Sequence, residues 1–344
     1  MSVSGPSPDL FFDTIGAFQR TEALRAAIDL DLFTHVAAGR CTADEMAAAC
    51  QASPRGVRIL ADYLTLIGFL RKQDDRYALT PDSDAFLNRN SPAYLGGVVE
   101  FLLTPDLREC FSTLTAAVRQ GGTASSSEGT VSPDNPVWVA FARSMGPMMR
   151  LPAERLAGLV GGDLDRPLRV LDRPLRVLDV AAGHGLFGIT IARHYPQAVV
   201  TALDWANVLA VAAENAGHAG VADRLTLLPG SAFDVDWGGP YDIVLLTNFL
   251  HHFDVPTCER LAAKAHAALA DGGRAITLEF VPNPDRVSPA ATAGFALTML
   301  ATTARGDAYT FAEYEQIFAR AGFARSEFHP FPPTAQQAIV SHKS

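Results

Sequence analysis

A glycine-rich turn between two apolar segments is the part of this sequence with the clearest chemical meaning. The turn Gly183–Gly188 reads G-x-G-x-x-G, follows an apolar run at 175–180, and precedes a second run, 199–203, that ends at Asp204. In an open parallel sheet, such a turn lets backbone N–H groups approach a nucleoside-bearing cofactor, and the acid accepts hydrogen bonds from ribose hydroxyls. The pattern therefore predicts a cofactor site.

Two cofactors fit this turn. The glycine spacing is that of a dinucleotide site, in which the acid lies about 20 residues further on. Asp179, four residues before Gly183, would face the pyrophosphate of a nicotinamide cofactor but would attract the ammonium and sulfonium groups of S-adenosylmethionine (SAM). Local chemistry therefore favours SAM. A nicotinamide dinucleotide, or a turn that binds no ligand, remains open.

Two adjacent histidines follow another apolar run. The segment 241–247 is followed by His251 and His252, and the later segment 274–279 ends at Glu279. The carboxyl ends of parallel strands form one rim, where a histidine can take a proton from a hydroxyl and a carboxylate can orient its ring. Neighbouring residues point in different directions, so we expect one histidine at most to face the cofactor. A capping role for either histidine remains open.

The composition limits the possible partners. The chain has 344 residues, of which 19% are charged and 48% hydrophobic, and its net charge is -9. This acidity argues against nucleic acid as a partner. The nine histidines do not cluster at metal-ligand spacing, and no CxxC pair occurs among Cys41, Cys50, Cys110 and Cys258, so we expect neither a metal site nor a disulfide framework. With no signal-like start or long apolar run, we expect a cytoplasmic protein that binds no membrane.

The N-terminal third reads as a winged helix-turn-helix. A capping box opens a helix at Thr42, Ser53 and Pro54 open a second helix, and the segment 69–79 reads as a hairpin. Such a module binds DNA or serves as a dimerisation scaffold. Because acidic residues offset Arg55 and Arg58, we favour dimerisation. We assign 1–105 to this domain.

The remaining chain predicts an α/β fold. Residues 106–165 read as a linker with connecting helices that contribute to the substrate pocket, and residues 166–344 as a SAM-binding catalytic domain. Strands are expected at 175–180, 199–204, 225–229, 241–247 and 274–280, and a terminal antiparallel hairpin at 325–331 and 336–341. This alternation of strands and helices predicts a doubly wound, mostly parallel, seven-stranded sheet.

A heptapeptide occurs twice. RPLRVLD forms residues 166–172 and again 173–179. Only the second copy continues directly into the glycine-rich turn, so only it is expected to form the first strand. We expect no function for the upstream copy.

These motifs resemble those of a known family over nearly the whole chain. The sequence is similar to the SAM-dependent small-molecule O-methyltransferases of the plant caffeate and acetylserotonin type and to their bacterial relatives. The resemblance rests on Leu178–Gly188, Asp204-Trp205, Gly230–Phe233, Asn248–Asp254, Leu269–Glu279, Gly306–Phe311 and Ala321–Phe323. It implies a homodimer, a small hydroxyl-bearing acceptor and SAM as the cofactor.

The resemblance also assigns roles to residues. His251 matches the general base, and Glu279, 28 residues later, matches the acid beside it. The second flanking acid of the family falls at Ala308, so Asp307 is the candidate to replace it. The cofactor residues implied are Asp179, Gly183, Gly185, Asp204, Trp205, Ser231, Ala232, Phe233 and Asn248. Met145, Met149, Met299 and Thr303 fall in regions that line the acceptor pocket.

The chain departs from the family pattern at the cofactor site as well. The first glycine of the usual turn is Ala181, and the acid that contacts adenine in plant members is Ser231. Both changes are compatible with SAM binding. The expected function is methyl transfer to an aromatic or polyketide-like hydroxyl. A NAD-dependent oxidoreductase, a SAM-binding homologue with altered chemistry, and a regulator remain as alternatives.

Overall fold

The computed structural model describes residues 5–125, 136–162 and 173–344. The chain divides into two compact units, Met1–Val99 and Glu100–Ser344, and each has an apolar core of its own. The three-part division expected from the sequence, with limits at 105 and 165, stays a prediction, and its second limit falls outside the described residues.

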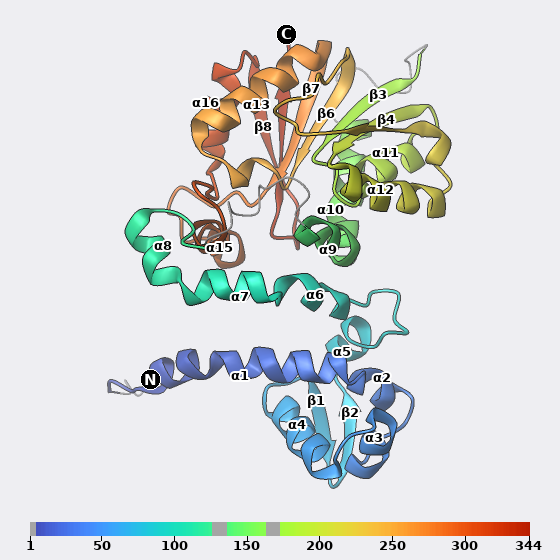
Figure 1. The fold of residues 1–344 in the computed structure, drawn as a ribbon, viewed down its shortest axis with the longest axis vertical. Helices are drawn as coiled ribbons and strands as arrows, with labels where there is room; N and C mark the ends of the chain where they lie inside the picture. The colour runs from blue at the N-terminus through green and yellow to red at the C-terminus, as the bar shows by residue number, and fades with distance from the viewer. Residues whose placement is uncertain (1–4, 126–135, 163–172) are drawn as a thin grey trace. The chain divides into compact units, whose positions relative to one another are not determined.

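The first unit is a helical domain with a two-stranded wing (Figure 1). Its elements are α1 (Asp9–Asp29), α2 (Leu32–Ala37), α3 (Ala43–Cys50), α4 (Pro54–Leu66), β1 (Leu70–Gln73), β2 (Arg76–Leu79) and α5 (Pro81–Phe86). Thr42 and Glu45 form the predicted capping box, and Ser53 caps α4 with Pro54 in the first turn. The antiparallel wing pairs Leu70 with Leu79, so the predicted hairpin is confirmed.

The second unit begins with helices and continues as alternating strands and helices. The leading helices are α6 (Val99–Leu102), α7 (Pro105–Ser112), α8 (Leu114–Gln120), α9 (Pro136–Ser144) and α10 (Gly146–Gly162). The strands are β3 (Leu175–Val180), β4 (Ala198–Asp204), β5 (Leu225–Pro229), β6 (Tyr241–Thr247), β7 (Leu269–Glu279), β8 (Arg325–Pro330) and β9 (Gln337–His342). The later helices are α11 (Leu186–His194), α12 (Ala206–His218), α13 (Val255–Ala268), α14 (Ala290–Ala293), α15 (Phe295–Thr302) and α16 (Phe311–Arg320).

The seven strands form one sheet in the order β5-β4-β3-β6-β7-β9-β8. The predicted seven-stranded, mostly parallel sheet is confirmed, although β7 begins earlier than expected. In this sheet of the described chain, β9 runs in the direction opposite to the other strands and is antiparallel to both neighbours, β7 and β8; it lies inside the sheet and not at its edge. The crossover through α14–α16 leaves a gap beside β7, and the short return from β8 fills that gap with β9.

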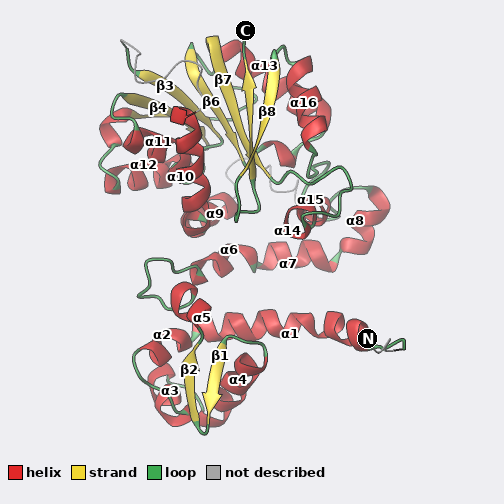
Figure 2. Cartoon of the chain, turned by 180° about the vertical axis from the view of Figure 1, so that it is seen from behind, coloured by secondary structure: helices red, strands yellow, loops and turns green. Residues whose placement is uncertain are grey.

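Helices cover both faces of the sheet (Figures 1 and 2). On one face, Val244, Leu246 and Ala275 pack with residues of α13 and α16 in the main apolar core. On the other face, Leu159 and Val160 of α10 lie over Ile243 of β6 and Ile276 of β7. From β3 the chain builds outward to β5 and then returns to β6 on the other side of β3. Ligands bind at such a switch point, beyond the carboxyl ends of the strands.

The second RPLRVLD copy forms β3, as predicted. Its first residue, Arg173, donates two hydrogen bonds to the Asp242 carboxylate, at 2.8 and 2.5 Å, and the backbone N–H of Arg176 donates to the same group at 2.9 Å. These bonds tie the copy to the start of β6 and fix its register. The first copy, 166–172, lies outside the described residues.

Candidate active site

Asp179 is buried beneath the glycine-rich turn, at the end of β3. Its side chain is fully buried, and Oδ2 accepts a hydrogen bond from the backbone N–H of Gly188 at 3.1 Å. A Cβ on Gly188 would lie 2.7 Å from a methyl of Val200 and 3.1 Å from Asp179 Oδ2, so only glycine allows this approach. Asp179 Oδ1 has no hydrogen-bond partner within the described part of the chain.

The turn itself follows a left-handed path. Gly183 and Gly185 have φ of +58° and +71°, values that glycine adopts without steric cost. Ala181, where the family carries its first glycine, has φ of +54°. An alanine in this region brings its Cβ too close to the following carbonyl. The departure noted in the sequence is therefore a strained position in the structure.

Asp204 links the turn to the end of β4. One carboxylate oxygen accepts from the N–H of Gly183 at 2.8 Å, and the other accepts from the N–H of Trp205 at 2.7 Å. An ionised carboxylate can accept about four hydrogen bonds, so Asp204 keeps capacity for ribose hydroxyls. The Trp205 side chain packs beside Val208 and Ala142.

The two carboxylates, Asp179 and Asp204, favour a positively charged ligand. Burial raises the pKa of Asp179 to about 7, with a smaller contribution from the nearby charge of Asp204, and burial raises the pKa of Asp204 to about 6. A cationic ligand would favour ionisation of both groups, whereas a pyrophosphate would oppose it. The unpartnered Asp179 Oδ1 is placed to accept a hydrogen bond from an ammonium. The site thus fits SAM better than a dinucleotide.

The loop after β5 carries three further predicted cofactor residues. Gly230 N–H donates to the carbonyl of Asp204 at 2.9 Å, which joins this loop to the end of β4. Ser231 Oγ accepts from the N–H of Phe233 at 3.1 Å. Lys264 of α13 donates to the carbonyls of both Ala232 and Phe233, at 2.7 and 3.0 Å, and so holds the loop in place.

Glu279 and His251 form a buried pair at the ends of β7 and β6. Their side chains are 0% and 5% exposed, and His251 Nδ1 lies in hydrogen-bond contact with Glu279 Oε2. Glu279 Oε1 accepts the backbone N–H groups of Phe249 and Leu250, at 2.9 and 2.8 Å. The carboxylate is thus an acceptor on both oxygens, and the Nδ1–H of His251 donates to it. No hydrogen bond engages His251 Nε2 within the described part of the chain.

Aromatic rings surround the His251 imidazole. Phe295 lies edge-on to it, with ring centroids 4.9 Å apart, and Phe280 stacks on Phe295 at 3.8 Å. His252 sits beside it at 4.3 Å and faces Trp138 of α9 at 5.4 Å. Burial, together with the neighbouring His251, lowers the pKa of His252 well below its usual value. Of the two adjacent histidines, only His251 has a carboxylate partner within the described residues.

Asp307 reaches His251 through its backbone and not through its carboxylate. Its N–H donates to the His251 carbonyl at 3.0 Å, and a Cβ on Gly306 would lie 2.2 Å from that same oxygen. The Asp307 carboxylate instead lies 3.5 Å from Arg286 and is 42% exposed. The structure does not bring this carboxylate to the imidazole: its partners are Arg286 and the backbone N–H of Ala308.

The four predicted acceptor-pocket residues are all buried. Thr303 does not offer its hydroxyl to a ligand, because Oγ1 donates to the Met299 carbonyl at 2.7 Å and accepts from the N–H of Gly306 at 2.8 Å. The Met149 sulfur accepts a hydrogen bond from Asn248 Nδ2 at 3.6 Å. Met145 is 7% exposed and begins the turn into α10.

Several residues of the site lay outside the sequence prediction. Gln336 is 4% exposed, and its Nε2 lies 3.7 Å from the Met149 sulfur. Phe141 of α9 approaches the position of a Cβ on Gly183 to 3.8 Å. Phe280 directly follows Glu279, so its place beside the acid was readable from the sequence. Gln336 had no such signal, because its position depends on how β9 enters the sheet.

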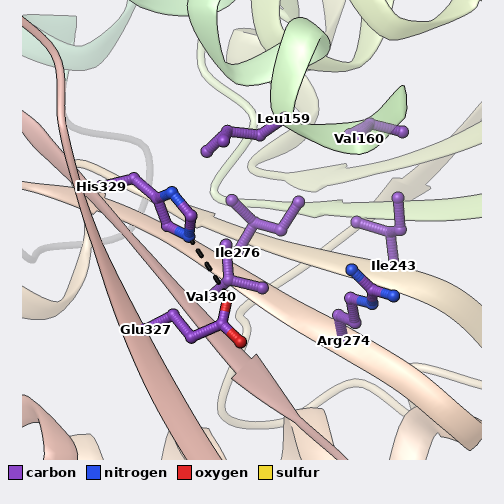
Figure 3. Close-up of a pocket in the computed structure, with 8 residues that line it drawn as sticks. All are labelled: Leu159, Val160, Ile243, Arg274, Ile276, Glu327, His329 and Val340. Carbon is purple, nitrogen blue, oxygen red and sulfur yellow. Dashed lines mark ion pairs between the residues drawn. The ribbon is translucent and has the colours of Figure 1, made fainter. Parts of the chain in front are cut away.

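The hollow on the α10 side of the sheet is too small for a cofactor. Figure 3 shows Leu159 and Val160 of α10 above Ile243 and Ile276, with Glu327 paired to His329 at 3.5 Å. The cavity holds about 10 Å³, about the volume of one water probe. Within residues 5–125, 136–162 and 173–344, no group of three or more His, Cys, Asp or Glu is arranged to hold a metal ion, and no helix is long and apolar enough to cross a membrane.

Comparison with known proteins gives a consistent result. Residues 156–324 match the model of an O-methyltransferase domain, and residues 12–89 match an O-methyltransferase dimerisation domain. The 3-hydroxy-5-methyl-1-naphthoate 3-O-methyltransferase of Streptomyces sahachiroi is 28% identical over 97% of this chain and 94% of its own. Acetylserotonin O-methyltransferase of Mus musculus is 30% identical over 91% and 83%.

Solved structures of other proteins share the fold of this chain. A crystal structure of a candidate O-methyltransferase from Nostoc punctiforme is 52% identical and superposes with a TM-score of 0.94, over 98% of this chain and 100% of that one. Other solved structures of this fold contain SAM or its product S-adenosylhomocysteine.

Replacing Ala181 by glycine relieves the strained turn. We expect Ala181→Gly to raise the free energy of unfolding by about 1 kcal/mol, since the left-handed conformation costs an alanine roughly 1–2 kcal/mol and the added freedom of the unfolded chain offsets part of that. Urea denaturation measures the change. Ala182→Gly is the matched control and should lower stability, because Ala182 does not have a positive φ. A loss of stability in Ala181→Gly would contradict the assignment of strain to this residue.

The raised pKa of Asp179 makes the ligand-free protein sensitive to pH. The folded pKa of about 7 lies above the ordinary value of about 3.9. The contribution of Asp179 to the free energy of unfolding is therefore fully present below about pH 4 and is lost as the pH rises to about 7. Asp179→Asn keeps an acceptor for Gly188 and removes this loss. In urea denaturation between pH 5 and pH 8, the variant should gain stability relative to wild type up to about pH 7 and no further. Parallel profiles would contradict the raised pKa.

Proposed function

Because the chain belongs to the family of SAM-dependent small-molecule O-methyltransferases, we propose that it methylates a hydroxyl of a planar aromatic or polyketide-like acceptor, with His251 as the general base. The observation that carries the assignment of the base is the buried pair of His251 and Glu279, with Nδ1 engaged and Nε2 left for a ligand. Residues 12–89 are the dimerisation domain.

The residues at the ends of β3 and β4 would hold the cofactor. Asp179 would accept a hydrogen bond from the methionyl ammonium through its unpartnered Oδ1, and Asp204 would accept the ribose hydroxyls. The loop Ser231–Phe233 would border the adenine, with Ser231 as a neutral partner. When bound, SAM supplies an electrophilic methyl group on a cationic sulfur, which departs as the neutral thioether of S-adenosylhomocysteine.

His251 would remove the acceptor proton. Glu279 holds Nδ1 as the donor, so Nε2 carries the lone pair that takes the proton from the acceptor hydroxyl. The deprotonated oxygen would then be the nucleophile toward the methyl group that bound SAM supplies. The Glu279 carboxylate stabilises the imidazolium that results. General base catalysis of this kind contributes on the order of 10²–10⁴-fold, and alignment of the oxygen, carbon and sulfur supplies the rest.

A single carboxylate, that of Glu279, is proposed to orient the His251 ring. The position of the family's second acid is Ala308, which is fully buried, and the Asp307 carboxylate pairs with Arg286. The Asp307 N–H and the close approach of Gly306 instead fix the His251 backbone. We therefore assign orientation of the ring to Glu279 alone.

The surroundings of the base suit a flat apolar ring. Phe280 and Phe295 form a stacked pair beside His251, and Met149 and Met299, in regions expected to line the acceptor pocket, are buried. Aromatic faces and methionine sulfur both pack well on aromatic ligands. Two relatives with known acceptors act on a naphthoate and on acetylserotonin, and both acceptors are aromatic.

Self-association is proposed to use the first half of α1. This segment exposes five large apolar side chains, each more than 60% accessible: Leu10, Phe11, Phe12, Ile15 and Phe18. Exposed apolar side chains gathered on one short segment are typical of an interaction site. Homodimerisation is the role that fits the matched dimerisation domain.

The alternatives receive no such support. The relatives named above are methyltransferases and not oxidoreductases, although the glycine spacing is that of a dinucleotide site, and the paired carboxylates disfavour a pyrophosphate. Nothing in the matched domains favours a DNA-binding role for the wing.

Removing the base tests this function. We expect His251→Ala to lower turnover by at least 10²-fold, since proton transfer is lost, while the Kd for SAM changes by less than about threefold. Transfer of labelled methyl groups to a panel of phenols, catechols and naphthols measures turnover, and calorimetry measures SAM binding.

The neighbouring histidine is the matched control. His252→Ala should cost less than about tenfold in turnover, because His252 has no carboxylate partner among the described residues. Turnover in His251→Ala close to that of wild type would exclude His251 as the base. Failure of wild type to bind SAM would exclude the function as a whole.

A further inference from the structure

Two primary amides converge on one methionine sulfur near the end of β6. Asn248 Nδ2 lies 3.6 Å from the Met149 sulfur, and Gln336 Nε2 lies 3.7 Å from the same atom. Gln336 is only 4% exposed, and Asn248 Oδ1 is buried with no hydrogen-bond partner in the described part of the chain. The amides come from different elements: Asn248 directly follows β6, and Gln336 directly precedes β9.

This contact satisfies the amides poorly. A thioether sulfur is a weak acceptor, whereas each primary amide carries two N–H donors and a carbonyl acceptor. Buried polar groups in native proteins are nearly all hydrogen-bonded, so an exception calls for an explanation. A ligand with its own oxygen atoms is one such explanation. The sulfur, on a flexible unbranched side chain, then fills the space that the ligand takes.

The residues on either side of Gln336 are held by elements of the acceptor side of the proposed site. The next residue, Gln337, pairs across the sheet with Glu279, the partner of His251. The preceding residue, Ala335, accepts the hydroxyl of Thr292 of α14 at 2.9 Å, and α15, which follows, brings Phe295 onto the His251 ring. Gln336 therefore lies between a residue paired with the end of β7, which carries Glu279, and a residue bonded to α14, which leads into α15 and Phe295. The cofactor turn, in contrast, lies at the ends of β3 and β4.

We propose that Gln336 determines acceptor specificity by hydrogen-bonding a second oxygen on the aromatic acceptor, a hydroxyl or carbonyl beside the hydroxyl that is methylated. The inference rests on the proposed function, because it names the substrate class of that site. The amide N–H donates to a carbonyl, and the amide carbonyl accepts from a hydroxyl. Monohydroxylated aromatic acceptors leave the buried amide unpaired and are disfavoured.

The test compares acceptors that differ by one oxygen. Wild type, Gln336→Leu and Gln336→Met are assayed for transfer of labelled methyl groups from SAM to the naphthols and to the isomeric dihydroxynaphthalenes. In wild type, the best dihydroxynaphthalene should exceed the naphthols in kcat/KM. We expect the ratio of these two kcat/KM values to fall by about 10–100-fold in both variants, mainly through KM.

Two measurements separate the possible failures. Thr334→Val alters the same loop, in which Thr334 Oγ1 contacts the Gln336 carbonyl at 2.9 Å, but leaves the amide side chain. This control should keep the wild-type ratio, and a similar drop in Thr334→Val would assign the effect to loop distortion and overturn the proposal. An unchanged ratio in Gln336→Leu and Gln336→Met would also overturn it.

If no naphthol or dihydroxynaphthalene is methylated by wild type, the proposed function fails for this acceptor class. Calorimetry with S-adenosylhomocysteine present then measures the Kd of each compound, and the ratio of the Kd values for naphthols and dihydroxynaphthalenes replaces the ratio of kcat/KM values. A preference of wild type for dihydroxynaphthalenes that Gln336→Leu loses still supports the inference. A lack of any preference overturns it.

Discussion

The site depends on one buried carboxylate. Glu279 has no solvent to stabilise its charge, and a buried ion is tolerated only when hydrogen bonds surround it. Three groups do so: the N–H groups of Phe249 and Leu250 and the ring of His251. The two backbone bonds hold the short helical turn after β6, and the third bond sets the ring on that turn. The end of β7 thus decides both where the base stands and which of its nitrogens is free. This arrangement needs β6 and β7 to be parallel neighbours, with their carboxyl ends at one rim.

At the cofactor site, in contrast to Glu279, burial disfavours the charge of the two carboxylates. Burial raises the pKa of both Asp179 and Asp204, and the nearby charge of Asp204 adds to the shift of Asp179. A positively charged ligand would favour the ionised form of both carboxyls, so its binding would release protons. The distinction between SAM and a dinucleotide therefore lies in the charge of the site, since the glycine spacing fits both cofactors.

Much of the fold followed from local patterns in the sequence, and less of the site did. The apolar strands, the caps at Thr42 and Ser53 and the wing each depend on residues close in the chain, and the structure confirms them. Asp307 could not be judged locally, because its carboxylate pairs with Arg286, which is distant in the sequence. Gln336 was missed for a similar reason: it reaches the site only because β9 inserts between β7 and β8, and nothing in the hairpin sequence specifies that insertion.

The turnover of Glu279→Gln tests the central claim most directly. A glutamine keeps a carbonyl oxygen for the N–H groups of Phe249 and Leu250 but presents an NH₂ group to the imidazole, so Nδ1 becomes the acceptor and the proton moves to Nε2. We predict a loss in turnover of about 10²–10⁴-fold, with the Kd for SAM and the unfolding midpoint close to those of wild type. Turnover within about threefold of wild type, with the variant folded, would show that Glu279 does not set the state of the base.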